Sequence, residues 1–148
     1  MATGAVGETA LRPRQRARRL ALLALFEAEF PPQRAEAALE RLLRDETVPG
    51  TVAAQARSIV AGVEDKRAAL DAEIARWAPA IPVAELGRIE RSILRSALFE
   101  VLYSAAVPSG TIRDSVSLAR IYAGDAASRL VGGVLRSVTR PSVEGDKG

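Results

Sequence analysis

Residues 12–26 read RPRQRARRLALLALF, and this stretch joins a run of arginines directly to an apolar helix. No acidic residue occurs between Glu8 and Glu27. Apolar side chains nearly encircle the segment from Leu20 to Phe26, which is typical of a helix buried at the centre of a fold. The stretch therefore predicts a fixed positive surface at the start of a buried helix. We call its five arginines the arginine arm: Arg12, Arg14, Arg16, Arg18 and Arg19.

The chemistry of the arginine arm indicates a nucleic acid as its partner. Guanidinium groups pair bidentately with phosphates, so we expect all five arginines to contact RNA or DNA. The alternative is a solvated helix start or a solubilising tail, which is what most basic runs are. Two observations favour the nucleic acid. The run contains no lysine, and cations at a helix N-terminus oppose the helix dipole, so local stability does not explain them.

The composition indicates a helical binding protein and argues against an enzyme. The chain has the length of one domain, with 148 residues, 48% of them hydrophobic and only 4% aromatic. Its core must therefore consist of Leu, Ala, Val and Ile, which suits closely packed helices. The absence of Cys and His excludes disulfides, thiolate and imidazole catalysis and the usual zinc sites. No pair of clustered carboxylates is evident, so we expect no catalytic residue, metal or cofactor.

The sequence predicts a cytoplasmic protein with no membrane partner. No segment approaches the ~20 apolar residues of a membrane span. Arginines before an apolar run superficially resemble a signal peptide, but the run is short and leads to Glu27 and Glu29 without a small-residue cleavage pattern.

Charge is distributed unevenly along the chain. Residues 20–100 hold ten basic and thirteen acidic residues, whereas residues 101–140 hold five arginines and two aspartates. The chain thus has positive ends and an acidic middle, which indicates one surface for an anion and another for a basic partner.

Apolar periodicity predicts helices throughout and no strand, so we expect an all-α fold. Residues 78–82, APAIP, form the clearest internal boundary. We expect one helical domain over residues 12–140, split near 78–82, between disordered tails at 1–11 and 141–148. The expected helices cover residues 14–29; 33–45; 52–77, as one helix or two joined near Gly62; a helix with Pro82 in its first turn that continues past Val101; a helix capped by Thr111 that ends at Gly124; and a last helix capped by Asp125 that continues through Val138.

The last predicted helix contains two unexpected features. Gly132 and Gly133 lie inside an otherwise regular pattern, and each costs roughly 0.8–1 kcal/mol relative to Ala. Either close helix packing or the close approach of a ligand backbone would explain them. Arg129 lies in the first turn, where the helix dipole disfavours it, so it is a further candidate for RNA contact. Of the few aromatic side chains, we expect Trp77 to pack in the core.

Taken in order, five segments resemble the bacterial NusB family of transcription antitermination factors. Order and spacing agree from about Arg14 to Val138. The segments are RQRARRLALLALFEAE at 14–29, IVAGVEDKRAALDAEI at 59–74, RIERSILRSALFEVLYSAAVP at 88–108, DSVSLA at 114–119 and RLVGGVL at 129–135.

The resemblance implies a NusB-like fold of two packed helical subdomains with about six to seven helices, and no catalysis. It implies binding of single-stranded boxA-type RNA together with the small-subunit ribosomal protein NusE. The two would be bound within transcription elongation complexes that alter termination and support ribosomal RNA synthesis. The family contains monomers and dimers, so a homodimer is also possible.

The resemblance assigns roles to individual residues. Arg14, Arg16 and Arg18 match the basic arm that contacts RNA in the family, and Glu90 matches a glutamate that contacts NusE. In the last helix, the family usually has an acid–serine pair followed by FVNGVL. Leu130 therefore stands at the aromatic position and Gly132 at the amide position of a second RNA-contacting region.

Departures in that helix leave a second interpretation open. Ala126 and Ala127 replace the acid–serine pair, and the aromatic and amide groups are absent. The chain could therefore be a protein-interaction module that keeps the NusE surface but binds RNA weakly or not at all. Gly133 matches the family's glycine, which favours helix packing as its role.

Overall fold

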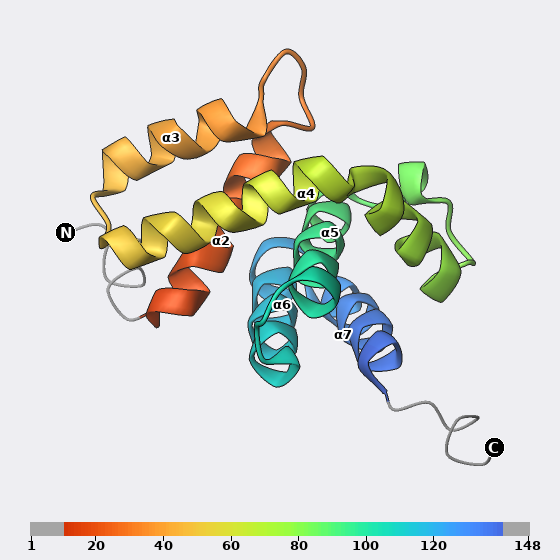
Figure 1. Ribbon diagram of the computed structural model, residues 1–148. Helices are drawn as coiled ribbons and strands as arrows, with labels where there is room; N and C mark the ends of the chain where they lie inside the picture. The colour runs from red at the N-terminus through yellow and green to blue at the C-terminus, as the bar shows by residue number, and fades with distance from the viewer. Residues whose placement is uncertain (1–10, 141–148) are drawn as a thin grey trace.

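The computed structural model describes residues 11–140, and this range contains six α-helices, one short 3-10 helix and no strand (Figure 1). The prediction of an all-α fold is confirmed. Apart from Leu11, the two expected tails lie outside the described residues. The elements are α2 (Pro13–Glu27), α3 (Ala35–Glu46), α4 (Gly50–Trp77), the 3-10 helix η1 (Val83–Glu85), α5 (Arg88–Tyr103), α6 (Pro108–Ala123) and α7 (Asp125–Thr139).

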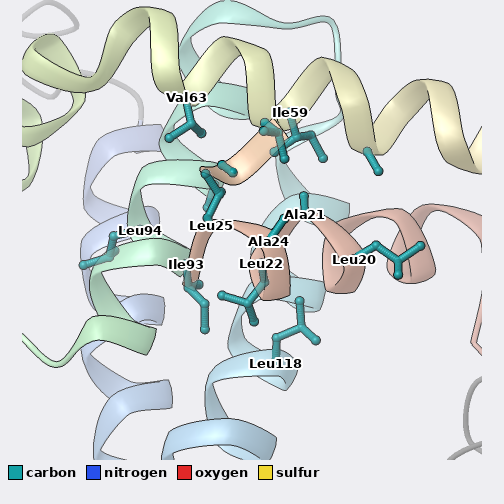
Figure 2. Close-up of a cluster of buried hydrophobic side chains, with 14 of the residues drawn as sticks. Leu20, Ala21, Leu22, Ala24, Leu25, Ile59, Val63, Ile93, Leu94 and Leu118 are labelled. Atoms are coloured by element: carbon teal, nitrogen blue, oxygen red, sulfur yellow. The ribbon is translucent and has the colours of Figure 1, made fainter. Parts of the chain in front are cut away.

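Helix α2 forms the centre of the molecule, as its apolar girdle predicts. It packs against α3, α4, α5 and α6. Because a helix that is apolar on all sides must be covered on all sides, these neighbours enclose it almost completely. Figure 2 shows the resulting cluster, in which side chains of α2 meet those of α4, α5 and α6. Its members include Leu20, Ala21, Leu22, Ala24, Leu25, Ile59, Val63, Ile93, Leu94 and Leu118.

Helix α4 is one continuous helix of 28 residues, which settles the choice between one helix and two. Gly62 does not interrupt it. A Cβ atom at Gly62 would lie 2.1 Å from ring carbons of Phe99 on α5. The missing side chain thus lets the Phe99 ring lie directly against the α4 backbone.

The predicted helix start at Pro82 is wrong. Residues 83–85 form η1, Leu86 is extended, and α5 begins only at Arg88. The guanidinium of Arg91 donates hydrogen bonds to the backbone carbonyls of Val83 (3.1 Å) and Ala84 (3.2 Å). These hydrogen bonds give the loop carbonyls the partners that a regular helix would otherwise supply. The loop also places the Leu86 side chain in the core.

Helix α6 begins earlier than predicted. Pro108 occupies its first turn, where the missing N–H costs nothing, so Thr111 lies inside the helix and is not its cap. Asp125 is the first residue of α7 and makes no capping hydrogen bond. Gly124 separates α6 from α7 with a φ of 97°, a conformation that favours glycine.

Ion pairs link α5 to α4 and to the segment that follows α2. Arg95 donates to Asp71 (2.7 Å) and Glu29 (2.9 Å), and Arg91 also pairs with Glu29. Helices α5, α6 and α7 pack on one another, whereas α3 packs on α2 and α4 (Figure 1). Within residues 11–140, no helix is long and apolar enough to cross a membrane.

Candidate nucleic-acid interface

The arginine arm lies at the N-terminal end of α2, but its five side chains differ in exposure. Arg12, just before the helix, and Arg14 are exposed. Arg16 and Arg19 are half-buried. Arg18 is buried, with only 3% of its surface exposed. The arm is therefore a folded structure with an interior and a surface, and only part of it faces solvent.

Arg18 is the centre of what we call the buried ion cluster, formed with Glu100, Asp114 and Thr111. Its guanidinium donates two hydrogen bonds of 2.9 Å to the Glu100 carboxylate. It also donates to Asp114 (2.6 Å) and to the Thr111 hydroxyl (3.2 Å). The guanidinium of Arg18, expected from the sequence to contact RNA, is enclosed and occupied by two carboxylates in this structure. Its role is to fix α2 against α5 and α6.

Asp114 connects the buried ion cluster to the surface. This carboxylate is fully buried, yet Arg12 donates to it at 2.6 Å and Arg113 lies 3.4 Å from it. Burial alone would raise the pKa of Asp114, but the hydrogen bonds and charges of Arg12 and Arg18 outweigh it and lower that pKa below its ordinary value. The carboxylate thus stays ionised and holds the exposed Arg12 in place at the start of α2.

The remaining arm residues extend over two sides of α2. Arg14 is exposed and forms no ion pair with any residue in the described range. On the other side, Arg19 donates to the Tyr122 hydroxyl (3.1 Å) and lies 3.5 Å from Glu46. The ring of Tyr122, at the end of α6, is partly exposed. Together these residues form a positive surface with one accessible aromatic ring.

The candidate RNA-contacting residues on α7 differ in their exposure to solvent. Arg129 is exposed, and Leu130 is half-buried and packs on the core. Gly132 is buried under the Arg136 guanidinium, which would lie 2.9 Å from an added Cβ. The Arg136 side chain thus covers Gly132, one of the residues predicted to contact RNA. The packing role expected for Gly133 is wrong, because Gly133 is exposed and nothing lies within 4 Å of an added Cβ.

Glu90 lies in the first turn of α5, apart from the arm. Its carboxylate folds over the N-terminus of the helix, 2.3 Å from the position that a Cβ on Gly87 would take. A negative charge there is favoured by the helix dipole. Glu90 and Glu100 are ten residues apart, or about 15 Å along the axis. The proposed protein contact and the buried ion cluster thus occupy opposite ends of α5.

Three residues of the buried ion cluster did not emerge from the sequence as functional: Glu100, Asp114 and Thr111. Glu100 carried a signal, since it is an acid within the apolar run SALFEVLY. A buried acid requires a partner, and Arg18 is the arm residue that is buried beside it. Asp114 and Thr111 carried no comparable signal.

Comparison with known proteins places this chain in a family. The model of the NusB family matches residues 15–140. The chain belongs to the NusB family. Curated relatives named transcription antitermination protein NusB are similar to it along most of their length. The relative from Dehalococcoides mccartyi is 33% identical over 128 residues, covering 86% of this chain and 90% of the relative. The relative from Roseiflexus castenholzii is 34% identical over 138 residues, covering 91% and 97%.

Solved NusB structures share the fold of this family member. T. maritima NusB superposes with a TM-score of 0.81 at 27% identity, covering 92% of this chain and 96% of that one. NusB from a crystal structure of the antitermination factors NusB and NusE with double-stranded RNA has a TM-score of 0.78 at 22% identity, covering 86% and 96%. The relatives are named as transcription factors and not as enzymes, in agreement with the chemistry inferred from composition.

Proposed function

We propose that this NusB-family protein binds boxA-type single-stranded RNA together with the ribosomal protein NusE, and that it acts in transcription elongation complexes to support ribosomal RNA synthesis. The observation that carries the proposal is the positive surface at the start of α2, which the buried ion cluster holds in a fixed position. A solved complex of NusB and NusE with double-stranded RNA, which shares this fold, supports RNA and NusE as the two classes of partner.

We infer the residues that take part from their exposure and from their partners in the structure. Arg12, Arg14, Arg16 and Arg19 supply the contacts to phosphates, and Arg129 on α7 supplies a further one. Arg18 positions these groups and does not touch RNA. Leu130 offers a small apolar contact where the family has an aromatic ring. Glu90 contributes to the NusE surface at the far end of α5.

A salt titration tests the RNA contact. Three to five phosphate contacts on a single strand predict that log K falls with log salt with a slope of roughly −2 to −3.5. The measurement is the anisotropy of a labelled boxA-type RNA, with and without NusE, at several salt concentrations. Arg14→Ala should weaken binding and make the slope shallower. Arg76→Ala is the matched control, since this exposed arginine lies in the last turn of α4 and not in the arginine arm. Absence of binding in every condition would exclude the proposal.

One observation favours the alternative of a protein-interaction module without RNA binding. Helix α7 presents neither an amide nor an aromatic ring, because Gly132 is covered by Arg136 and Leu130 packs on the core. In that case Glu90→Arg abolishes capture of NusE, while joint replacement of Arg12, Arg14 and Arg16 by alanine leaves antitermination intact. Equal damage by both sets of replacements would rule this alternative out.

A further inference from the structure

A hollow of about 290 Å³ opens beside the arginine arm, between α2, α4 and the loop from α5 to α6. It lies at the small end of the usual range for ligand pockets, so it suits a small group and not an extended chain. Its walls come from segments that are far apart in the sequence. The residues that decide its chemistry are Arg14, Gln55, Ser58, Ile59, Phe99 and Ser104.

The walls combine apolar and polar groups in a way that suits a flat heteroaromatic ring. Ile59 is buried and Phe99 is half-buried, so both offer apolar contact. The amide of Gln55 and the hydroxyl of Ser58 can donate and accept hydrogen bonds at the edge of a ring. Arg14 adds an exposed positive charge at the rim. A nucleobase has these complementary features, with two apolar faces, a polar edge and an attached phosphate.

The hollow is preformed. Gly62 lets the Phe99 ring lie against α4, and Tyr103 stacks on that ring at a centroid distance of 6.3 Å. Arg18 and Glu100, both immobilised in the buried ion cluster, also line the hollow. A base can therefore enter without a rearrangement of the helices.

One further cation lies beyond the hollow on α4, the Lys66 ammonium, which is 3.8 Å from the Asp65 carboxylate. The Lys66 ammonium lies 5.1 Å from the centroid of the Tyr103 ring, and Tyr103 itself is partly exposed. Gln55, Ile59, Gly62 and Lys66 fall on one stripe of α4, because their spacings of four, three and four residues follow the helical repeat. The stripe thus leads from Arg14 toward a second cation, which fits an anionic chain better than a protein segment.

We propose that this hollow holds one unstacked base of the bound single-stranded RNA, with the adjoining phosphate on Arg14. The inference rests on the proposed function and adds a site of base contact to an arm that otherwise contacts phosphates. Phosphate contacts fix position and carry no sequence information, whereas a base held in a hollow contributes to sequence preference.

An abasic scan tests the proposal. Each base of a boxA-type RNA is replaced in turn by an abasic residue, and affinity is measured by anisotropy. Loss of the seated base should weaken binding about 5- to 150-fold at one position, the range found for a base in contact with an aromatic side chain. Ser58→Trp fills the hollow from its exposed rim. This variant should bind the unmodified RNA more weakly by a similar factor, and it should no longer respond to the abasic residue at that position.

Ala72→Trp is the matched control, because Ala72 is an exposed residue of the same helix outside the hollow. The Ala72→Trp variant should bind the unmodified RNA, and distinguish it from the abasic RNAs, as the parent protein does. Gln55→Leu is a second variant that keeps the shape of the wall and removes its polar group, and it should reduce the preference for the base at the sensitive position. Circular dichroism and urea unfolding establish that each variant is folded.

The outcomes separate this inference from the proposed function. If the protein binds RNA but all abasic RNAs bind alike, or Ser58→Trp binds like the parent, the seat for a base is excluded and the RNA-binding function stands. If Ser58→Trp impairs capture of NusE and leaves RNA binding unchanged, the hollow is a protein contact and the inference fails. If the parent binds no RNA with or without NusE, the proposed function fails and the inference with it.

Discussion

At the scale of single residues, Arg18 decides whether the arginine arm has a defined shape. Replacing it by methionine leaves the buried Glu100 without its partner and removes one partner of Asp114. Breaking a buried ion pair on one side costs about 3–5 kcal/mol, because a charge stays buried without compensation. We expect Arg18→Met to lose that much stability in urea unfolding followed by circular dichroism. Arg14→Met, at an exposed position of the same arm, should change stability by less than about 0.5 kcal/mol. Similar effects of the two replacements would contradict the structural role of Arg18.

The ionisation of Asp114 predicts a dependence of stability on pH. Its pKa is lower in the folded protein than in the unfolded chain, so its contribution to the free energy of unfolding is fully present above the unfolded pKa of ~4. That contribution is lost as the pH falls through the lowered folded pKa, because the carboxyl then takes up a proton. We expect Asp114→Asn to be less stable than the parent at pH 7 and to lose less stability between pH 5 and pH 2. Parallel pH profiles of the two proteins in urea unfolding would contradict this assignment.

The same two residues show where sequence reasoning stops at this scale. The arm could be recognised from its composition alone, because five arginines without an acid are a local feature. The burial of Arg18 could not, since Glu100 and Asp114 lie 82 and 96 residues further along the chain. The sequence of the arm does not distinguish the buried arginine from the exposed ones, because the carboxylates that pair with Arg18 come from distant segments.

At the scale of elements, two glycines inside helices should respond in opposite ways to replacement by alanine. Gly62→Ala on α4 places a Cβ against the Phe99 ring, and overpacking of this kind costs about 1–3 kcal/mol. Gly133→Ala on α7 meets nothing, so the gain in helix propensity of roughly 0.8–1 kcal/mol remains. We expect the first variant to be destabilised and the second stabilised in urea unfolding. A stabilised Gly62→Ala would show that α4 and α5 are less closely packed than the structure has them.

The sequence predicted that each helix is present, but it did not predict where α5 and α6 begin. The periodic apolar positions of α2, α4 and α7 are repeated over several turns, so the pattern outweighs any single residue. The start of a helix depends on few residues. Pro82 and Thr111 carried suitable local signals, but the Arg91 hydrogen bonds to loop carbonyls and the position of Pro108 determined the actual starts of α5 and α6.

At the scale of the whole molecule, the two helical halves should unfold together. Helix α2 packs against α3 and α4 on one side and against α5 and α6 on the other, and ion pairs from Glu29 and Asp71 to Arg95 reinforce the junction. The only tryptophan, Trp77, reports on the far end of α4, while circular dichroism reports on all helices. We expect the two signals to give the same midpoint in urea, as in a two-state transition. An earlier change in fluorescence would show that the end of α4 unfolds independently.

The internal anchoring of the arm affects the entropy of binding. Many arginine-rich segments are disordered before they meet RNA, and ordering their backbone opposes association. Here the arm is already a helix from Pro13 onward, and Arg18 holds its central turn inside the protein. Only exposed side chains such as Arg14 must lose freedom when a strand binds. The protein therefore resembles a rigid template more than a flexible tether, and the spacing of its charges is set before any RNA arrives.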